Sequence, residues 1–425
     1  MEKRTDDKKN MRQVPTNIVA VKDDRLTTFC RIVFFAFVVL FALEFLGKNY
    51  LWLYMGFAFF LLTTRFLRFR LEIIPLLVLS LSMIFFSGAL PGLTELLRIF
   101  AFPLCYLVGS NLWVEKDSEK LSLKKQENLL KWSVYAFALG TFAHFCLNFA
   151  INFGTGADRN TIDVWSGAVR SATNQAAFGI LTVGVAIALF FSNRKTLKKI
   201  AAIVMLAVVV VYALTLAGRT IFVIIAAVGV AALLFMWLKN PNRTKTFWVS
   251  CLLFLLAVTA MALFVFNAFG IRDVITGSNF YKRFFGESGG EGLSETSRWG
   301  TKAYYLEHFF EHIFGGSHLL TETGEYAHDI LLDTYDQSGI FALLAVVVFL
   351  IISLYQTVAF VADRRFSFNV RQLVLCISLV MAIEFCVEPI FYGMPWLFCA
   401  FCFMQGAIAN ARQNADQIAP LGVRR

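Results

Sequence analysis

Four of the five histidines in this 425-residue chain lie close together, at positions 308, 312, 318 and 328. His308, Glu311 and His312 form the pattern H-x-x-E-H, which holds zinc in one class of metalloproteases when both rings share one face of a helix. Such a short pattern arises easily among aromatic and charged residues, and no third ligand follows in a soluble segment. We therefore favour an interfacial helix with polar residues facing water or lipid head groups, and we expect no metal.

His328 opens a different segment, HDILLDTYDQSG, directly before a long apolar run. A neutral imidazole at this point could accept a proton from a hydroxyl group near neutral pH. The alternative is a surface histidine that caps a helix, and the spacing alone does not separate the two. Asp333 and Glu325 are the next candidates for a base.

Three arginines lie beside apolar runs. Arg219 follows one run in LAGRT, Arg298 begins the segment SRWG, and Arg170 lies in WSGAVRSATNQ. A charge at the edge of a membrane is costly unless it is paired or functional. Guanidinium groups that converge there could bind a phosphate or diphosphate through two parallel hydrogen bonds. The alternative for each arginine is anchoring to lipid head groups.

The composition requires lipid as the solvent for most of the chain. Hydrophobic residues make up 58% and charged residues 16%, whereas a soluble protein has about 45–50% and about 25%. The net charge of +10 comes mainly from short basic clusters between apolar runs. That placement is typical of a topology signal, so we expect no binding to nucleic acid.

A membrane-spanning helix needs about 20 apolar residues. Twelve candidate runs occur, near 28–46, 50–64, 71–89, 94–113, 128–151, 174–192, 200–217, 220–238, 247–269, 340–360, 373–392 and 394–411. The sequence thus predicts an all-α, polytopic membrane protein of about twelve transmembrane helices.

Basic clusters follow every second run and predict the cytoplasmic side. From them we expect a cytoplasmic tail over 1–26, transmembrane helices over 27–269, an external loop over 270–338, further transmembrane helices over 339–411, and a cytoplasmic tail over 412–425. No cleavable signal peptide is expected at the polar N-terminus. The external loop begins with clustered glycines and turns helical in character from Arg298 to Phe314, where Gly315 and Gly316 should end the helix. A long loop with its own structure is more often functional than connective.

Taken together, these segments resemble the O-antigen ligase and polymerase superfamily of bacterial membrane glycan transferases. The resemblance rests on AGRT after an apolar run, on SRW before an aromatic helix that ends at Gly315-Gly316, and on His328 followed by Leu331, Leu332 and Gly339. Two positions depart from the pattern: Asp329 replaces the usual asparagine, and Gln337, with Asp336 adjacent, replaces an acidic residue.

The resemblance implies a fold like that of lipid-linked-sugar glycosyltransferases and a site on the external face of the bacterial inner membrane. It implies transfer of a glycan from undecaprenyl diphosphate to a sugar hydroxyl, on a growing glycan or on lipid A-core, with neither cofactor nor metal. Carried onto this sequence, Arg219 and Arg298 would hold the diphosphate, and His328 would deprotonate the acceptor. Arg170 is a further candidate for the diphosphate, from its place beside an apolar run and not from the resemblance.

A lipid or polysaccharide transporter is the alternative from another class. Transporters place ionisable residues within the bilayer and often contain repeated groups of helices. Glu384 and Glu388, in the eleventh run, favour that interpretation. No convincing repeat is visible, however, and most ionisable residues outside the basic clusters gather in the external loop.

Overall fold

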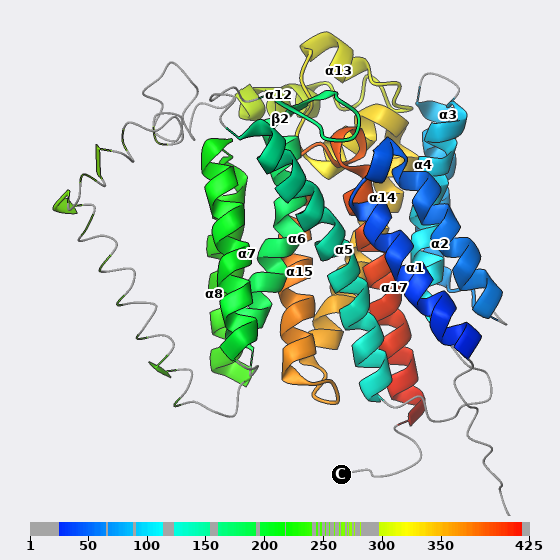
Figure 1. Cartoon of the computed structure of the whole chain (residues 1–425). Coiled ribbons are helices and arrows are strands. Elements are labelled where there is room, and N and C mark those ends of the chain that lie inside the picture. The colour runs from blue at the N-terminus through cyan, green and yellow to red at the C-terminus, as the bar shows by residue number, and fades with distance from the viewer. Residues whose placement is uncertain are drawn as a thin grey trace, which may run out of the picture.

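The structure is a computed structural model that describes residues 25–64, 67–87, 91–113, 123–153, 160–192, 196–216, 218–239 and 297–418, with scattered residues between 244 and 281. Long helices form one bundle (Figure 1): α1 (Arg25–Ala42), α2 (Asn49–Thr63), α3 (Ile74–Phe86), α4 (Leu93–Ser110), α5 (Leu123–Asn152), α6 (Ala172–Phe191), α7 (Thr196–Thr215), α8 (Arg219–Lys239), α14 (Ile330–Ala362), α15 (Phe368–Val387) and α17 (Pro395–Ile418). Two short 3₁₀ helices, η1 (Phe45–Gly47) and η2 (Leu71–Ile73), precede α2 and α3.

Every predicted apolar run except 247–269 overlaps one of these helices. The start of the predicted external loop and the predicted N-terminal tail lie almost wholly outside the described residues, and the run 247–269 is described only at scattered positions. Helix α17 continues to Ile418, so the first half of the tail predicted over 412–425 is helical. Within the described part, seven helices are long and apolar enough to cross a membrane, namely α4, α5, α6, α7, α8, α14 and α15. The expected helical membrane protein is thereby confirmed in its general construction, whereas the count of about twelve spans stays a prediction.

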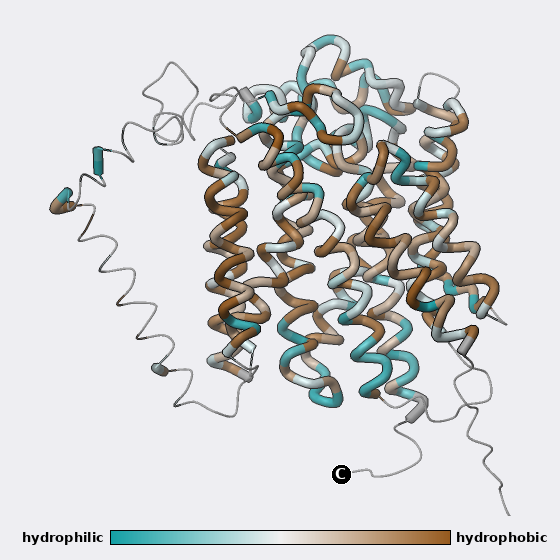
Figure 2. Tube along the Cα trace, in the orientation of Figure 1, coloured by the Kyte–Doolittle hydropathy of each residue, from teal (hydrophilic) through white to brown (hydrophobic). Residues whose placement is uncertain are grey.

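Hydropathy is arranged along the bundle as a bilayer requires. The middle of the bundle is predominantly hydrophobic, and hydrophilic residues gather at its two ends (Figure 2). Many large apolar side chains of α7, α8 and α14 are exposed, for example Val204, Val230 and Val348. Exposed aliphatic side chains at mid-helix suit contact with lipid tails and not with water.

Helix α17 is more polar than its neighbours because protein, and not lipid, surrounds it. Its closest packing is against α4, where glycines remove the side chains between the two backbones. A Cβ atom added to Gly109 would lie 2.1 Å from the carbonyl oxygen of Phe403, and one added to Gly406 would lie 2.3 Å from that of Tyr106. The side chain of buried Gln405 is hydrogen-bonded to the hydroxyl group of Thr357 in α14.

The connections α2–α3, α6–α7 and α14–α15 lie at one end of the bundle, and they hold several of the predicted basic clusters. The α5–α6 connection, the α7–α8 turn and the segment 297–329 lie at the opposite end (Figure 1). Chain direction therefore alternates as the basic clusters predict. We call the second end the loop end.

The α5–α6 connection departs from the all-α prediction because it contains a small hairpin. Strand β1 (Asn160–Ile162) pairs antiparallel with β2 (Val169–Ser171), with Thr161 opposite Arg170. Asp163 shapes the turn: its Oδ1 accepts hydrogen bonds from the backbone nitrogens of Trp165 and Ser166. An aspartate that bonds the backbone two residues ahead is a common turn former.

The described part of the external loop contains helices α12 (Ser297–Glu307) and α13 (His318–Thr323). They share a small core of Tyr305, Leu319 and Ala327. The helix expected from Arg298 to Phe314 ends earlier, at Glu307, so that prediction of its length is wrong. The chain leaves the helix because Phe309 stacks on Tyr335 at 4.0 Å and its carbonyl oxygen accepts a hydrogen bond from the Tyr335 hydroxyl.

Two glycines dock this loop onto α14. Gly315 and Gly339 have φ angles of +80° and +76°, and a Cβ added to Gly315 would lie 2.5 Å from the backbone nitrogen of Gly339. Backbone hydrogen bonds join the segments here, from Ile340 to Ile313 at 2.8 Å and from Ser317 to Asp336 at 2.8 Å. Only glycine permits this approach, and α14 bends at Gly339 because its backbone there is not helical.

Candidate active site

A cavity of about 520 Å³ opens at the loop end of the bundle. Its lining combines cationic, acidic and apolar side chains from four parts of the chain: Arg219, Thr220, Val223, Arg298, Trp299, Lys302, His328, Asp329, Ile383, Cys386 and Val387. Three of the four predicted site residues, Arg219, Arg298 and His328, therefore share one cavity although up to 109 positions separate them in sequence (328 − 219).

Most of the polar residues that line the cavity lie at or next to the ends of helices. Arg219 is the first residue of α8, and Arg298 lies in the first turn of α12. His328 directly precedes the start of α14, and Val387 is the last residue of α15. The first turn of a helix carries unpaired backbone N–H groups and a partial positive charge, which favour a bound anion. The start of α8 thus adds to the positive potential of the arginines.

Arg298 is fixed by the end of α15. Its Nη1 donates a hydrogen bond of 2.9 Å to the carbonyl oxygen of Val387, and its Nη2 lies 3.5 Å from Oε1 of Glu388. An arginine beside the last carbonyl groups of a helix also complements the negative end of the helix dipole. About a third of the Arg298 side chain, 31%, remains exposed, so donors are left for a ligand.

The backbone around His328 is held in a sparsely populated conformation. His328 has a φ angle of +54°, a region that histidine visits more often than most residues. Buried Asp333 stabilises this turn from both sides, because Oδ1 accepts from the nitrogen of Ala327 at 2.9 Å and Oδ2 from that of Asp329 at 3.1 Å. Asp333 is only 1% exposed, which makes it a positioning residue rather than a substitute base.

Glu388 contacts both Arg298 and His328. Its Oε2 lies 3.8 Å from Nδ1 of His328, and its Oε1 faces Arg298. Glu388 and Glu384 are both almost completely buried. The sequence favours a transport pathway for these glutamates; in the structure Glu388 lies behind Arg298 and His328, which line the cavity. The signal for a role here was an acidic residue at the end of an apolar run.

Lys302 and Asp329 are the remaining charged residues that line the cavity. Nothing in the sequence predicts that these two residues pair with each other. Nζ of Lys302 lies 3.5 Å from Oδ2 of Asp329 and donates to the carbonyl oxygen of Cys386 at 3.2 Å. Oδ1 of Asp329 accepts from the nitrogen of Leu331 at 2.9 Å and so caps α14. Aspartate and asparagine cap helices about equally well, which accounts for Asp329 at a position where asparagine was expected.

Arg170 lies elsewhere. Its guanidinium contacts Glu44 at 2.5 Å and Asp163 at 3.0 Å, and it lines a different cavity of about 340 Å³. Asp163 also contacts buried His144 at 2.9 Å. Burial opposes ionisation of Asp163, but hydrogen bonds from His144 and Ser166 and the charge of Arg170 hold its pKa well below the usual range.

Glu44, His144 and Asp163 are also the group of three potential metal ligands found in the described part of the chain. Arg170 already pairs with both carboxylates, so this cluster is better explained as an ion-pair network that ties the hairpin to Glu44 and to α5. Little in the sequence pointed to it, because Glu44 and Asp163 lie 119 positions apart (163 − 44).

The H-x-x-E-H segment has no shared site in the described structure. His308 lies in a turn beyond α12, where its ring stacks on Tyr304 at 4.0 Å. The ring of His312 instead stacks on His318 at 4.4 Å. The expectation that both rings share one helical face is wrong, because the helix has already ended at Glu307.

Fold and site together define a helical membrane protein with a cationic cavity at the loop end of the bundle, lined by a histidine that has a buried carboxylate behind it. Comparison with models of known protein families gives no match, and no curated protein is significantly similar to the chain.

Proposed function

We propose that this protein transfers a glycan from a polyprenyl-diphosphate donor to a sugar hydroxyl at the loop end of the bundle, as a surface-polysaccharide polymerase or an O-antigen ligase. The observation that carries the proposal is the shared cavity of Arg219, Arg298 and His328. The resemblance to O-antigen ligases and polymerases assigns a part to each of these three residues. On this proposal the loop end faces the outside of a bacterial inner membrane.

The cationic side chains suit the diphosphate. Arg219, Arg298 and Lys302 could contact its oxygens, and a planar guanidinium can make two parallel hydrogen bonds to one phosphate group. Val223, Ile383 and Val387 provide an apolar wall beside them. A polyprenyl chain that leaves the cavity along this wall would remain in contact with lipid, where its transfer free energy is most favourable.

The reaction needs one proton acceptor and a stabilised leaving group. His328 takes the proton of the acceptor hydroxyl as its oxygen forms a bond to the anomeric carbon of the donor sugar. The bond from that carbon to the diphosphate oxygen breaks, and the electron pair leaves on the diphosphate. Arg219 and Arg298 stabilise the developing negative charge. Atoms and charge balance with neither metal nor nucleotide.

Glu388 is a positioning residue in this scheme. It faces Nδ1 of His328, so the ring is oriented and the imidazolium that forms during transfer is stabilised. A carboxylate behind a histidine has the same effect in several hydrolases. Because Glu388 also contacts Arg298, it holds Arg298 and His328 at a fixed distance from each other.

The direct test is incubation of the purified protein with a polyprenyl-diphosphate glycan and an acceptor. Longer glycan chains would identify a polymerase, and transfer to lipid A-core would identify a ligase. Absence of both products, with a donor shown to bind, would refute glycan transfer and revive the transporter alternative.

Cys386 allows donor binding to be measured without turnover. It is exposed and lines the cavity, so a thiol reagent should modify it, and polyprenyl diphosphate should slow that modification. Cys146, half-buried in α5, is the internal reference and should react at an unchanged rate. Equal protection of both cysteines, or of neither, would contradict a diphosphate site in this cavity.

A further inference from the structure

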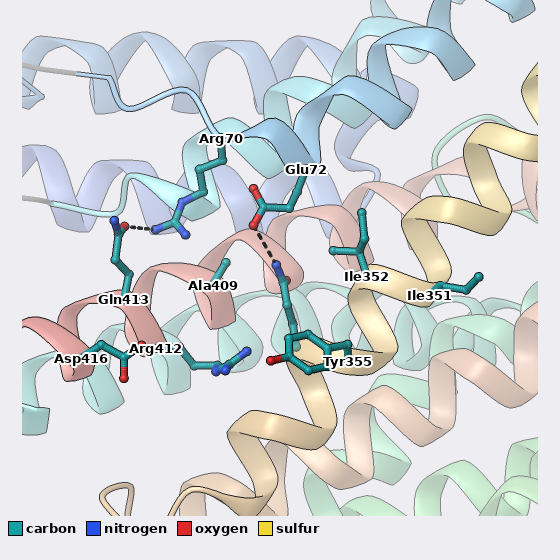
Figure 3. Close-up of a pocket in the computed structure, with 10 residues that line it drawn as sticks. Arg70, Glu72, Ile351, Ile352, Tyr355, Ala409, Arg412, Gln413 and Asp416 are labelled. Atoms are coloured by element: carbon teal, nitrogen blue, oxygen red, sulfur yellow. Dashed lines mark hydrogen bonds between the residues drawn. The ribbon is translucent and has the colours of Figure 1, made fainter.

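A second cavity, of about 680 Å³, lies near the opposite end of the bundle. It is formed by η2, the second half of α14 and the last turns of α17 (Figure 3). Four charged side chains line it: Arg70, Glu72, Arg412 and Asp416. This cavity is independent of the proposed glycan transfer, since its lining shares no residue with the site at the loop end.

The cavity lies at the depth of lipid head groups. Gln356, which lines it, is six residues from the end of α14 at Ala362, or about 9 Å along the helix axis. Tyr355 beside it is 67% exposed, and tyrosine is enriched at membrane–water interfaces. Toward the membrane centre α14 continues with exposed Ile351 and Leu354, which suit the contact of acyl chains.

Polar groups inside the cavity lack protein partners. Gln356 is only 6% exposed, and its Nε2 donates to Glu72 at 3.4 Å. Its buried Oε1, like the buried Nε of Arg70, has no hydrogen-bond partner among the described residues. An unsatisfied buried polar atom costs about 1–3 kcal/mol, so these atoms favour a polar ligand that can reach them.

The charges specify the ligand. Arg70 donates to Gln413 at 2.6 Å (Figure 3), and Arg412 lies over the ring of Tyr355 at 5.5 Å. Neither guanidinium is within 4 Å of a carboxylate among the described residues, so both can donate hydrogen bonds to a phosphate. Asp416 is already paired with Arg365. Glu72 accepts a weak bond from Gln356 and can take a cation.

We propose that this cavity binds the head group of a zwitterionic phospholipid with a primary ammonium group, as in phosphatidylethanolamine. Its phosphate contacts Arg70 and Arg412, its ammonium group donates to Glu72, and its acyl chains lie on the exposed apolar face of α14. Phosphatidylglycerol would leave Glu72 without a cation. Phosphatidylcholine carries the charge but has no N–H group to donate.

The test measures lipid retention by native mass spectrometry. Full-length protein, delipidated in detergent, is equilibrated with equal amounts of phosphatidylethanolamine, phosphatidylglycerol and phosphatidylcholine that carry the same acyl chains. The wild type should retain phosphatidylethanolamine in preference to both others. Arg70→Gln should reduce that retention about tenfold, the effect of losing one charge-assisted hydrogen bond. Arg364→Gln, an exposed arginine at the same end, should change nothing.

Glu72→Gln separates recognition of the ammonium group from general loss of structure. This variant should still retain phospholipid, but its preference for phosphatidylethanolamine should disappear. Soluble glycerophosphoethanolamine at the same concentration should not displace the lipid, because it lacks acyl chains. Wild-type retention of phosphatidylglycerol equal to that of phosphatidylethanolamine would overturn the proposal, as would an unchanged preference in Glu72→Gln.

Discussion

Nδ1 of His328 lies 3.8 Å from a carboxylate oxygen of Glu388, and Nδ1 is buried. This relationship leaves Nε2 as the nitrogen available to a ligand in the cavity. It also gives an imidazolium a nearby counter-charge. A surface histidine that merely caps a helix would need neither feature. The N-cap of α14 is Asp329 and not His328, so the proposed role of His328 as proton acceptor is the one to test.

His328→Ala should slow transfer by about 10²–10⁴-fold, the range for removal of a general base. Donor binding, measured through protection of Cys386, should be retained because the arginines are unchanged. Turnover and protection are measured on the same detergent preparation. Turnover at the wild-type rate would show that another residue is the base. Exposed Glu325, which accepts a hydrogen bond from Thr301 at 3.1 Å, would then be examined next.

Glu388→Gln should reduce kcat by a smaller factor, roughly tenfold to a hundredfold, because His328 remains while its counter-charge is lost. Donor binding should not weaken, since the substitution removes a negative charge beside Arg298. A glutamine has nearly the same shape, so the fold is preserved. Loss of donor binding with kcat unchanged would instead make Glu388 a support for Arg298.

Arg298→Lys and Arg219→Lys should each weaken donor binding, by roughly tenfold or more, although the charge is kept. Lysine lacks the planar pair of donors that a phosphate requires for two-pronged binding. Donor binding is measured by the concentration that protects Cys386. Arg170→Lys provides the matched comparison: it should leave donor binding unchanged and lower thermal stability, because Arg170 belongs to the ion-pair network with Glu44 and Asp163. Weaker donor binding in Arg170→Lys, with unchanged donor binding in Arg219→Lys and Arg298→Lys, would show that Arg170 binds the donor and that the other two arginines do not.

Gly339→Ala should separate the external loop from α14. The added Cβ would lie 2.7 Å from the carbonyl oxygen of Ile313, and the positive φ angle costs a further ~1 kcal/mol. Limited proteolysis should then cut within residues 297–329 at a higher rate, and transfer should fail. Gly300→Ala is the control, since a Cβ added to Gly300 would meet nothing within 4 Å. That change should stabilise α12 slightly, by about 0.5–1 kcal/mol. Equal sensitivity in both variants would contradict the docking role.

The sequence predicted the helices well because lipid imposes a strong and simple requirement on composition. The sequence also singles out Arg219, Arg298 and His328, by residue type and by resemblance, and these three residues line one cavity. It does not single out their neighbours. Lys302 and Asp329 meet only because α12 folds back over the start of α14, a tertiary contact without local signal.

Residues that fix backbone geometry were equally hidden. Asp336 receives backbone hydrogen bonds from Leu319 and Leu320, which explains an acidic residue one position before Gln337. The sequence predicts a helix stop at Gly315, yet the main constraint on Gly315 is the close approach of Gly339. Both facts depend on two segments that contact each other across the loop, and hydropathy periodicity carries no information about such contacts.

A cysteine at position 321, in α13, tests which face of the membrane carries the loop. Thr321 is exposed, and its replacement disturbs only a local bond to Ser317. In intact cells of a Cys386→Ser background, a membrane-impermeant thiol reagent should label Thr321→Cys. An Arg364→Cys variant, in the predicted cytoplasmic turn, should be labelled only after permeabilisation. The opposite labelling pattern would invert the orientation and move the proposed site to the cytoplasmic face.

The final prediction concerns acid sensitivity. The pKa of Asp163 is held well below its usual range in the folded protein, despite burial, by His144, Ser166 and Arg170. The pKa of an aspartate in the unfolded chain is about 3.9. A group whose pKa is lower when folded stabilises the protein fully above its unfolded pKa, and this contribution is lost as the pH falls toward the folded value.

Asp163→Asn should therefore lower stability near pH 7 by about 2–4 kcal/mol, since it leaves half-buried Arg170 with one anionic partner fewer. The melting temperature in detergent should differ most between variant and wild type above about pH 5, and the difference should shrink between about pH 5 and pH 3. Asp273→Asn is the control, because that side chain is 70% exposed and should have little effect at any pH. A difference between Asp163→Asn and wild type that stayed constant from pH 7 to pH 3 would show that the charge of Asp163 contributes nothing. The network would then act through shape and hydrogen bonding alone.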